Sequence, residues 1–290
     1  MDRLTFEPNS GDTQAAHGWK FERQYVSAKP DSASRRHSPE ILDPIVDLLH
    51  TDSKTLKECC LVFKSWIPRA RRHLFANIIL YLDEHLESWK KTFPDPSTSP
   101  AHYTKNLTIG CLHIVTAADA EPGGYITGFS RATHLEVDNH SIISESQLAT
   151  FLVPFHGFSP SLKSLYVDFT SLPSSQIFDL ILSFPLLENL KVIAYYPLPS
   201  IAHNNPTGLP ALIQPSSPPK FTGSLELSMR KGTEPPARRL CSLPSGIHFR
   251  RLTTTWNLWR DISMTMALVE GCSHTLESIN LTCDPFGRSI

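Results

Sequence analysis

The sequence predicts an α+β protein in which a short helical region precedes a longer region of parallel strands. Two observations support this prediction. Apolar residues recur at helical spacing through residues 39–80, whereas after residue 103 a strand-like element returns every 25 to 35 residues. The first 36 residues mix Ser, Asp, Lys, Arg and Gln without a period, so we expect residues 1–36 to be disordered.

The composition excludes several classes of partner and cofactor. A net charge of −1 argues against binding to bulk nucleic acid or to an anionic membrane. No stretch approaches the roughly 20 apolar residues that span a bilayer, and the N-terminus lacks a secretory signal. The six cysteines form no CxxC pair, so we expect core thiols in a reducing compartment and neither a disulfide framework nor a zinc site. We therefore expect a soluble intracellular protein, in the cytoplasm or the nucleus, without a cofactor.

Residues 39–80 divide into three short helical segments. Pro39 is well placed to start the first segment. Asp43 and Pro44 resemble a second helix start, so this segment is either kinked there or begins in earnest at Asp43. Ser53 is placed to cap the second segment, Pro68 is expected to end it, and residues 69–75 supply the third.

The second segment has more apolar residues than one buried stripe needs. Its inward stripe is Leu56, Cys59, Cys60, Phe63 and Ile67. Leu61, Val62 and Trp66 lie off that stripe. Either a partner protein completes this small core, or these helices form the first layer of a larger domain. The pattern alone leaves both possibilities open.

The order of motifs in this region resembles an F-box, most closely the form common in mushroom-type fungi. The motifs are Pro-Glu-Ile-Leu at 39–42, Leu-Val-Phe-Lys-Ser-Trp at 61–66, and Arg-x-x-Leu-Phe-x-x-Ile-x-Leu at 71–80. We assign residues 37–80 to this module, about a seventh of the chain. The family usually opens with Leu-Pro, and His37 and Ser38 stand in those two places.

The resemblance implies a substrate-recognition subunit of an SCF-type (cullin-RING) ubiquitin ligase. The F-box would bind the Skp adaptor, and through it a cullin scaffold. The residues implied in adaptor binding are Pro39, Ile41, Leu42, Ile45, Leu49, Leu61, Val62 and Trp66. Because of the altered opening at residues 37–38, an adaptor-independent interaction scaffold with a degenerate F-box is the alternative.

Residues 81–103 are expected to form a connecting helix and a linker, because residues 92–102 are rich in proline and serine. Residues 104–290 then carry the recurring element. It centres on Leu107, Leu135, Leu165, Leu190, Leu225, Leu252 and Ile279. In each copy a second residue two places on would point to the same side of a strand.

Helical patterns lie between some of the strands, at 144–157, 174–185 and 261–271. Strand and helix alternating at this period predict a degenerate leucine-rich-repeat-like solenoid with parallel strands. An ordinary α/β domain with parallel strands would leave a similar trace. Residues 197–219 are too rich in proline for regular structure, so we expect an insertion that loops out of the array. Since a solenoid needs a polar terminal cap, we expect a truncated or shortened member of the family.

The residue between each aliphatic pair would lie on the open face of the strands and contact a target protein. These residues are Thr108, Glu136, Tyr166, Lys191, Glu226, Thr253 and Asn280. Their mixed chemistry predicts a specific protein surface as the partner.

The sequence shows no catalytic motif. It has no phosphate-binding GxxxxGK[ST] loop, no G-x-S-x-G nucleophile elbow and no HExxH zinc motif. Asp83 with Glu84, or Asp138 with Asp168, are candidates for paired carboxylates, and surface charges explain both pairs more simply. We therefore expect that the chain is not an enzyme.

Overall fold

The computed structural model describes most of the chain between residues 39 and 283. The described residues are 39–62, 64–81, 83–110, 124–139, 155, 158, 160–171, 180–196, 219, 221–229, 234–243, 246–256 and 261–283. The expected disordered segment 1–36, the helix expected at 144–157 and the insertion at 197–219 lie outside these residues almost entirely.

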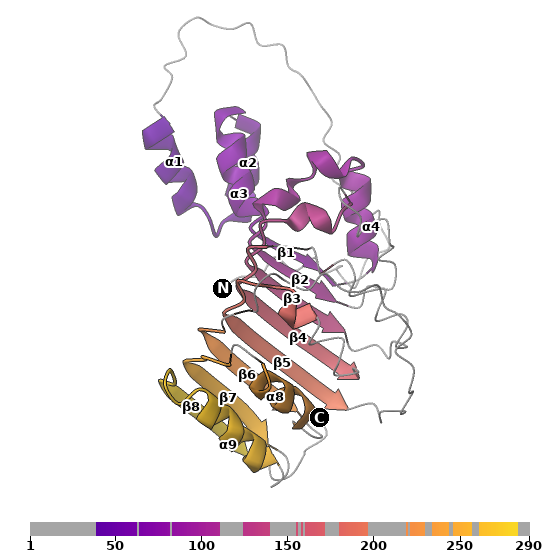
Figure 1. The fold of residues 1–290 in the computed structure, drawn as a ribbon. Coiled ribbons are helices and arrows are strands. Elements are labelled where there is room, and N and C mark those ends of the chain that lie inside the picture. The colour runs from indigo at the N-terminus through magenta and orange to yellow at the C-terminus, as the bar shows by residue number, and fades with distance from the viewer. Residues whose placement is uncertain are drawn as a thin grey trace, which may run out of the picture.

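Eight strands of the described residues form one sheet in the order β1-β2-β3-β4-β5-β6-β7-β8 (Figure 1). Their bounds are β1 Asn77–Leu80, β2 Asn106–Gly110, β3 His134–Asn139, β4 Ser164–Ser171, β5 Asn189–Tyr196, β6 Ser224–Met229, β7 Arg251–Trp256 and β8 Ser278–Cys283. Every neighbouring pair is parallel. The prediction of parallel strands is therefore confirmed, and all seven expected strands are present. The first strand, β1, was not expected, because it lies within the segment assigned to the helical module.

The register of the strands explains why this sequence stacks. Leu107 pairs with Leu135, Leu135 with Leu165, and so on through the sheet, so each recurring aliphatic residue lies beside its counterpart. The residues two places on form a second row on the same side, because side chains alternate along a strand. Both rows are buried from β1 through β7 and join one continuous apolar core. Burial of these two rows is the main stabilising contribution to the sheet.

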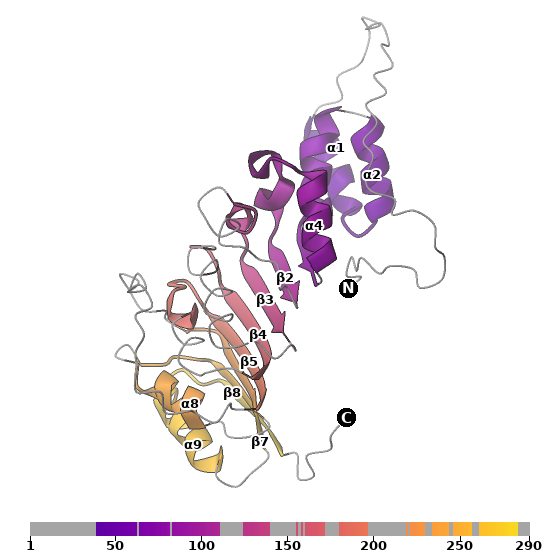
Figure 2. The same cartoon turned by 90° about the vertical axis from the view of Figure 1, so that its right-hand side faces the viewer.

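Two helices pack against the apolar core of the sheet before the last strand, β8. They are α8, Glu234–Cys241, and α9, Asp261–Gly271 (Figure 2). The helix expected at 261–271 is confirmed with those bounds. Thr265 and Leu268 of this helix are buried, whereas Met266 is exposed. The helix expected at 174–185 is described only from Leu180, where the chain is helical.

Three helices precede the sheet: α1 Pro39–Leu48, α2 Ser53–Val62 and α3 Ile67–Leu74. Two boundary predictions were wrong. Asp52, not Ser53, caps α2, since its carboxylate accepts a hydrogen bond from the Thr55 N–H at 3.0 Å. Pro68 does not end α2, which stops at Val62; it lies in the first turn of α3, where its missing N–H costs nothing.

The expected linker is packed structure. After helix α4, Asp83–Thr92, two 3-10 turns follow at Pro96–Thr98 and Pro100–Tyr103. The hydroxyl of Ser99 caps the second turn by accepting from the Ala101 N–H at 3.2 Å, and Ala101 is buried in the sheet core. The prolines therefore begin short turns that cover the core. Among the described residues, no helix is both long and apolar enough to cross a membrane.

Candidate functional site

The exposed large apolar side chains of the described residues gather mainly at two places, one of which is the pair of helices α1 and α2. Leu48 and Leu61 expose 80% and 78% of their surface, and Ile45 and Val62 are exposed as well. Helices α1 and α2 lie side by side in both views (Figures 1 and 2). Exposed apolar residues concentrated on a small unit are typical of a protein docking surface.

The adaptor-binding residues predicted from the sequence divide into three groups. Ile45, Leu61 and Val62 are exposed, as docking contacts must be. Leu49 and Trp66 instead pack against a small core that joins α1, α2 and α3. That core consists of Val46, Leu56, Cys59 and Ala70. The third group consists of Pro39, Ile41 and Leu42. Their backbone belongs to α1, but their side chains are not among those that the structure describes.

Leu48 is an exposed apolar residue that the predicted set lacks. It follows Ile45 by three positions in α1, and residues three apart lie on the same side of a helix. The spacing of three residues from Ile45 is the feature of the sequence that could have identified Leu48 as a docking residue. We define the docking set as Ile45, Leu48, Leu61 and Val62.

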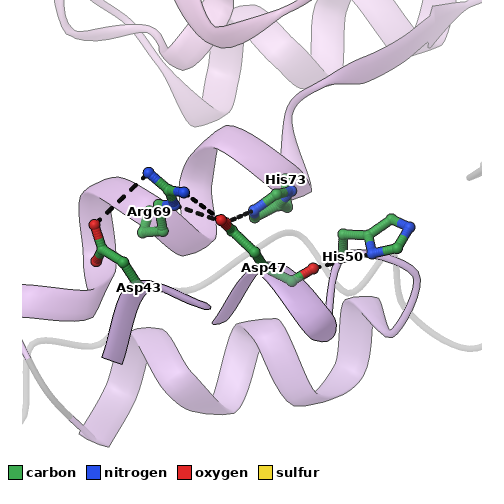
Figure 3. Close-up of polar contacts among 5 residues, drawn as sticks. All are labelled: Asp43, Asp47, His50, Arg69 and His73. Atoms are coloured by element: carbon green, nitrogen blue, oxygen red, sulfur yellow. Dashed lines mark hydrogen bonds and ion pairs between the residues drawn. The ribbon is translucent and has the colours of Figure 1, made fainter. Parts of the chain in front are cut away.

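A polar cluster joins α1 to α3 next to the docking set (Figure 3). Arg69 in α3 donates two hydrogen bonds to the Asp47 carboxylate, from Nε at 2.6 Å and from Nη2. His73 Nε2 lies 2.7 Å from Asp47 Oδ1, and Arg69 Nη1 lies 3.6 Å from Asp43 Oδ2. The hydrogen bond from Arg69, and then that of His73, holds the pKa of Asp47 well below the ordinary 3.8. Asp47 lies between Ile45 and Leu48, so this cluster orients the segment that carries half of the docking set.

Replacing Asp47 with asparagine should lower the thermal stability of the chain at neutral pH. The folded pKa of Asp47 lies below its ordinary value, so its carboxylate stabilises the fold above about pH 4 and loses that contribution at lower pH. The difference in melting temperature between wild type and Asp47→Asn, followed by circular dichroism, should therefore shrink as the pH falls towards 2. Asp43→Asn is the matched control, because Asp43 lies 3.6 Å from Arg69 Nη1, whereas Asp47 accepts two hydrogen bonds from Arg69. Equal effects of the two variants at pH 6 would contradict this role of Asp47.

The residues predicted to contact a target form one continuous row across the open face of the sheet. In register order they are Thr108, Glu136, Tyr166, Lys191, Glu226, Thr253 and Asn280. The structure therefore brings all seven together on one face. Whether they bind a target stays a prediction.

Five of the seven residues in this row contact a neighbour in the row. Thr108 donates to Glu136 Oε2 at 3.1 Å, and Lys191 Nζ lies 2.9 Å from Glu226 Oε1. Lys191 Nζ also lies over the Tyr166 ring, 4.8 Å from its centroid. A cation above an aromatic face is attracted to it, so Lys191 is held between two strands. These contacts form two groups, Thr108 with Glu136 and Tyr166 with Lys191 and Glu226.

A second polar row two residues on was not predicted as a unit. Asp138 and Asp168 pair in register. Asp138 accepts a hydrogen bond from the Tyr81 hydroxyl at 3.0 Å, and Asp168 accepts one from the Tyr166 hydroxyl at 3.0 Å. Burial, followed by the charge of Asp168, raises the pKa of Tyr166, so its hydroxyl stays a donor. Tyr81 reaches Asp138 across Gly110, where a Cβ would lie 2.6 Å from the tyrosine ring. The glycine was visible in the sequence, but its contact with Tyr81 depends on the unexpected strand β1.

The described residues show no group of three or more His, Cys, Asp or Glu side chains arranged to hold a metal ion. The cysteines at 59, 60, 241 and 272 are free thiols, of which Cys59 and Cys272 are buried. Burial raises the pKa of both buried thiols, which keeps them protonated and unreactive. Comparison with family models, with curated protein sequences and with solved structures finds no match for this chain.

Proposed function

We propose that this chain is the substrate-recognition subunit of an SCF-type ubiquitin ligase. In this proposal α1–α3 are an F-box that binds the Skp adaptor, and the sheet is a leucine-rich-repeat-like solenoid that binds a target protein. The exposed docking set on α1 and α2 is the observation that carries the proposal.

The size of the helical core supports a docking role for these helices. Among the described side chains of α1, α2 and α3, four apolar residues form the buried core, while the four residues of the docking set face solvent. Burying a leucine or valine side chain contributes about 1.5–3 kcal/mol relative to leaving it exposed. A helical partner laid across α1 and α2 would gain that contribution at several positions. The Skp adaptor is the partner implied by the F-box resemblance of the same residues.

The open face of the sheet supports target binding. Its row of aligned residues presents carboxylates, a lysine, a tyrosine, threonines and an asparagine across seven strands. A rigid sheet that carries both charge signs favours one complementary protein surface over many. Catalysis would come from other subunits, because holding a target near a ubiquitin-charged enzyme raises the rate by proximity. The complex would act in the cytoplasm or the nucleus of a fungal cell.

The proposal is tested by mixing the purified full-length chain with a purified fungal Skp adaptor. We expect a 1:1 complex that elutes as one peak in size-exclusion chromatography. No complex at micromolar concentrations would contradict the adaptor assignment for the native chain.

A variant then distinguishes the substrate-recognition subunit from the alternative, an adaptor-independent scaffold with a degenerate F-box. His37→Leu with Ser38→Pro restores the usual opening of the F-box family. If the native opening disables docking, this variant should bind the adaptor where the wild type does not. If neither binds, the helices are not an adaptor-binding module.

A further inference from the structure

The second group of exposed apolar residues lies on β8, at one end of the sheet. Ile279 and Leu281 continue the two apolar rows of the core, since they pair in register with Leu252 and Thr254. They expose 46% and 47% of their surface, whereas the row residues of β1 to β7 expose 6% or less. The core rows are therefore open to solvent at β8.

The opposite end of the same rows is covered. Ile78 and Leu80 of β1 are buried in the sheet core together with Leu86 and Trp89 of α4. A stack of strands needs such a cover at both ends, because each terminal unit otherwise exposes one side of its core. Among the described residues, α4 supplies the cover at β1, whereas Ile279 and Leu281 of β8 remain exposed.

The sequence of β8 lacks the features that keep an edge strand unpaired. Protein edges are commonly protected by lysine, proline or a β-bulge. Residues 278–283, Ser-Ile-Asn-Leu-Thr-Cys, contain no charged residue and no proline. Among the described strands β8 pairs with β7 alone, so the backbone groups on its other side face away from the sheet. An uncharged edge of this kind can pair with its own copy without repulsion between like charges.

We propose that β8 pairs with β8 of a second copy of this chain, in antiparallel orientation about a twofold axis. Asn280 lies opposite Asn280 of the partner, and Ile279 lies opposite the partner's Leu281. An axis perpendicular to the sheet keeps the apolar rows of both copies on the same side. The two sheets then join into one, and the four exposed apolar side chains cover one another. This inference is independent of adaptor binding.

The mass of the full chain in solution tests the pairing. Light scattering over a range of concentrations should show a species of twice the 32.5 kDa monomer mass. Leu281→Lys should shift the chain to monomer, because the lysine would face an apolar partner strand at the joined edge. Leu186→Lys is the matched control, since Leu186 is equally exposed but lies outside the strands, and this variant should remain dimeric.

The register is tested by single cysteines in a Cys283→Ser background. Asn280→Cys should cross-link to its own copy under mild oxidation, because directly opposed residues lie within disulfide reach. Ser278→Cys should not cross-link to its own copy. In this register residue 278 of the partner lies four residues further along the strand, at about 3.4 Å per residue.

Three results would overturn the proposal. One is a wild-type chain that is monomeric at every concentration, and a second is a dimer that survives Leu281→Lys. The third is a monomer in which β8 amides are protected from hydrogen exchange, because another segment of the chain would then cover the edge.

Discussion

A chain in which Leu48 and Leu61 are both changed to aspartate should fold normally and lose its affinity for the Skp adaptor. Both side chains are largely exposed, so a charge in either place costs the isolated fold little. At an interface the same charges would be desolvated against an apolar partner. Anchor residues typically contribute at least about 2 kcal/mol each, so we expect binding to weaken by more than about a hundredfold. Isothermal titration calorimetry against the purified adaptor measures the change.

The matched control for this variant is Leu186→Asp, which places the same charge at an exposed leucine outside the docking set. It should bind the adaptor like the wild type, and circular dichroism should give all three proteins the same helix content. Changing Trp66 would be less informative, because Trp66 packs against the small core and its loss would disturb the fold of α1–α3. Undiminished binding of the double aspartate variant would remove α1 and α2 as the docking surface.

The parallel sheet was predictable because its signal is repeated. Each strand from β2 to β8 carries an aliphatic residue followed by another apolar residue or threonine two places later, and the register aligns these positions. Strand β1 escaped prediction because its residues, Asn-Ile-Ile-Leu, also fit the end of the F-box pattern. Its assignment as a strand comes from pairing with β2, a contact 29 residues away along the chain. Local patterns do not contain that information.

The polar surfaces were predictable only in part. The seven-residue row follows from strand alternation, so its members could be named from the sequence. The cluster of Asp47, Arg69 and His73 could not, because it joins residues more than 20 positions apart whose side chains look like ordinary surface charges. The apolar pattern likewise could not separate Leu61, which is exposed, from Trp66, which is partly buried against the small core. Helix α2 ends at Val62, and Trp66 belongs to the 3-10 turn Lys64–Trp66. The helical periodicity of the second segment therefore does not extend to Trp66.

The largest loss of stability is expected from Leu165→Ala, in the middle of the sheet. Leu165 is 1% exposed and lies between Leu135 and Leu190 in the same apolar row. Its truncation removes buried methyl groups and leaves a cavity that parallel strands on both sides cannot close. Such changes cost about 2–5 kcal/mol, a large fraction of the 5–15 kcal/mol that stabilises a typical domain. Urea denaturation followed by circular dichroism should show a lower midpoint for the variant.

The slope of that transition reports whether the sheet unfolds as one unit. Each strand contacts its two neighbours in sequence, so a weakened centre could let the two halves of the stack melt separately. We expect the slope to stay unchanged, because both apolar rows run unbroken through β4 and join one core. Leu186→Ala should shift the free energy of unfolding by less than about 0.5 kcal/mol, since Leu186 is exposed. A small effect at Leu165, equal to that at Leu186, would contradict the alignment of the strands, because only that alignment buries Leu165 on both sides.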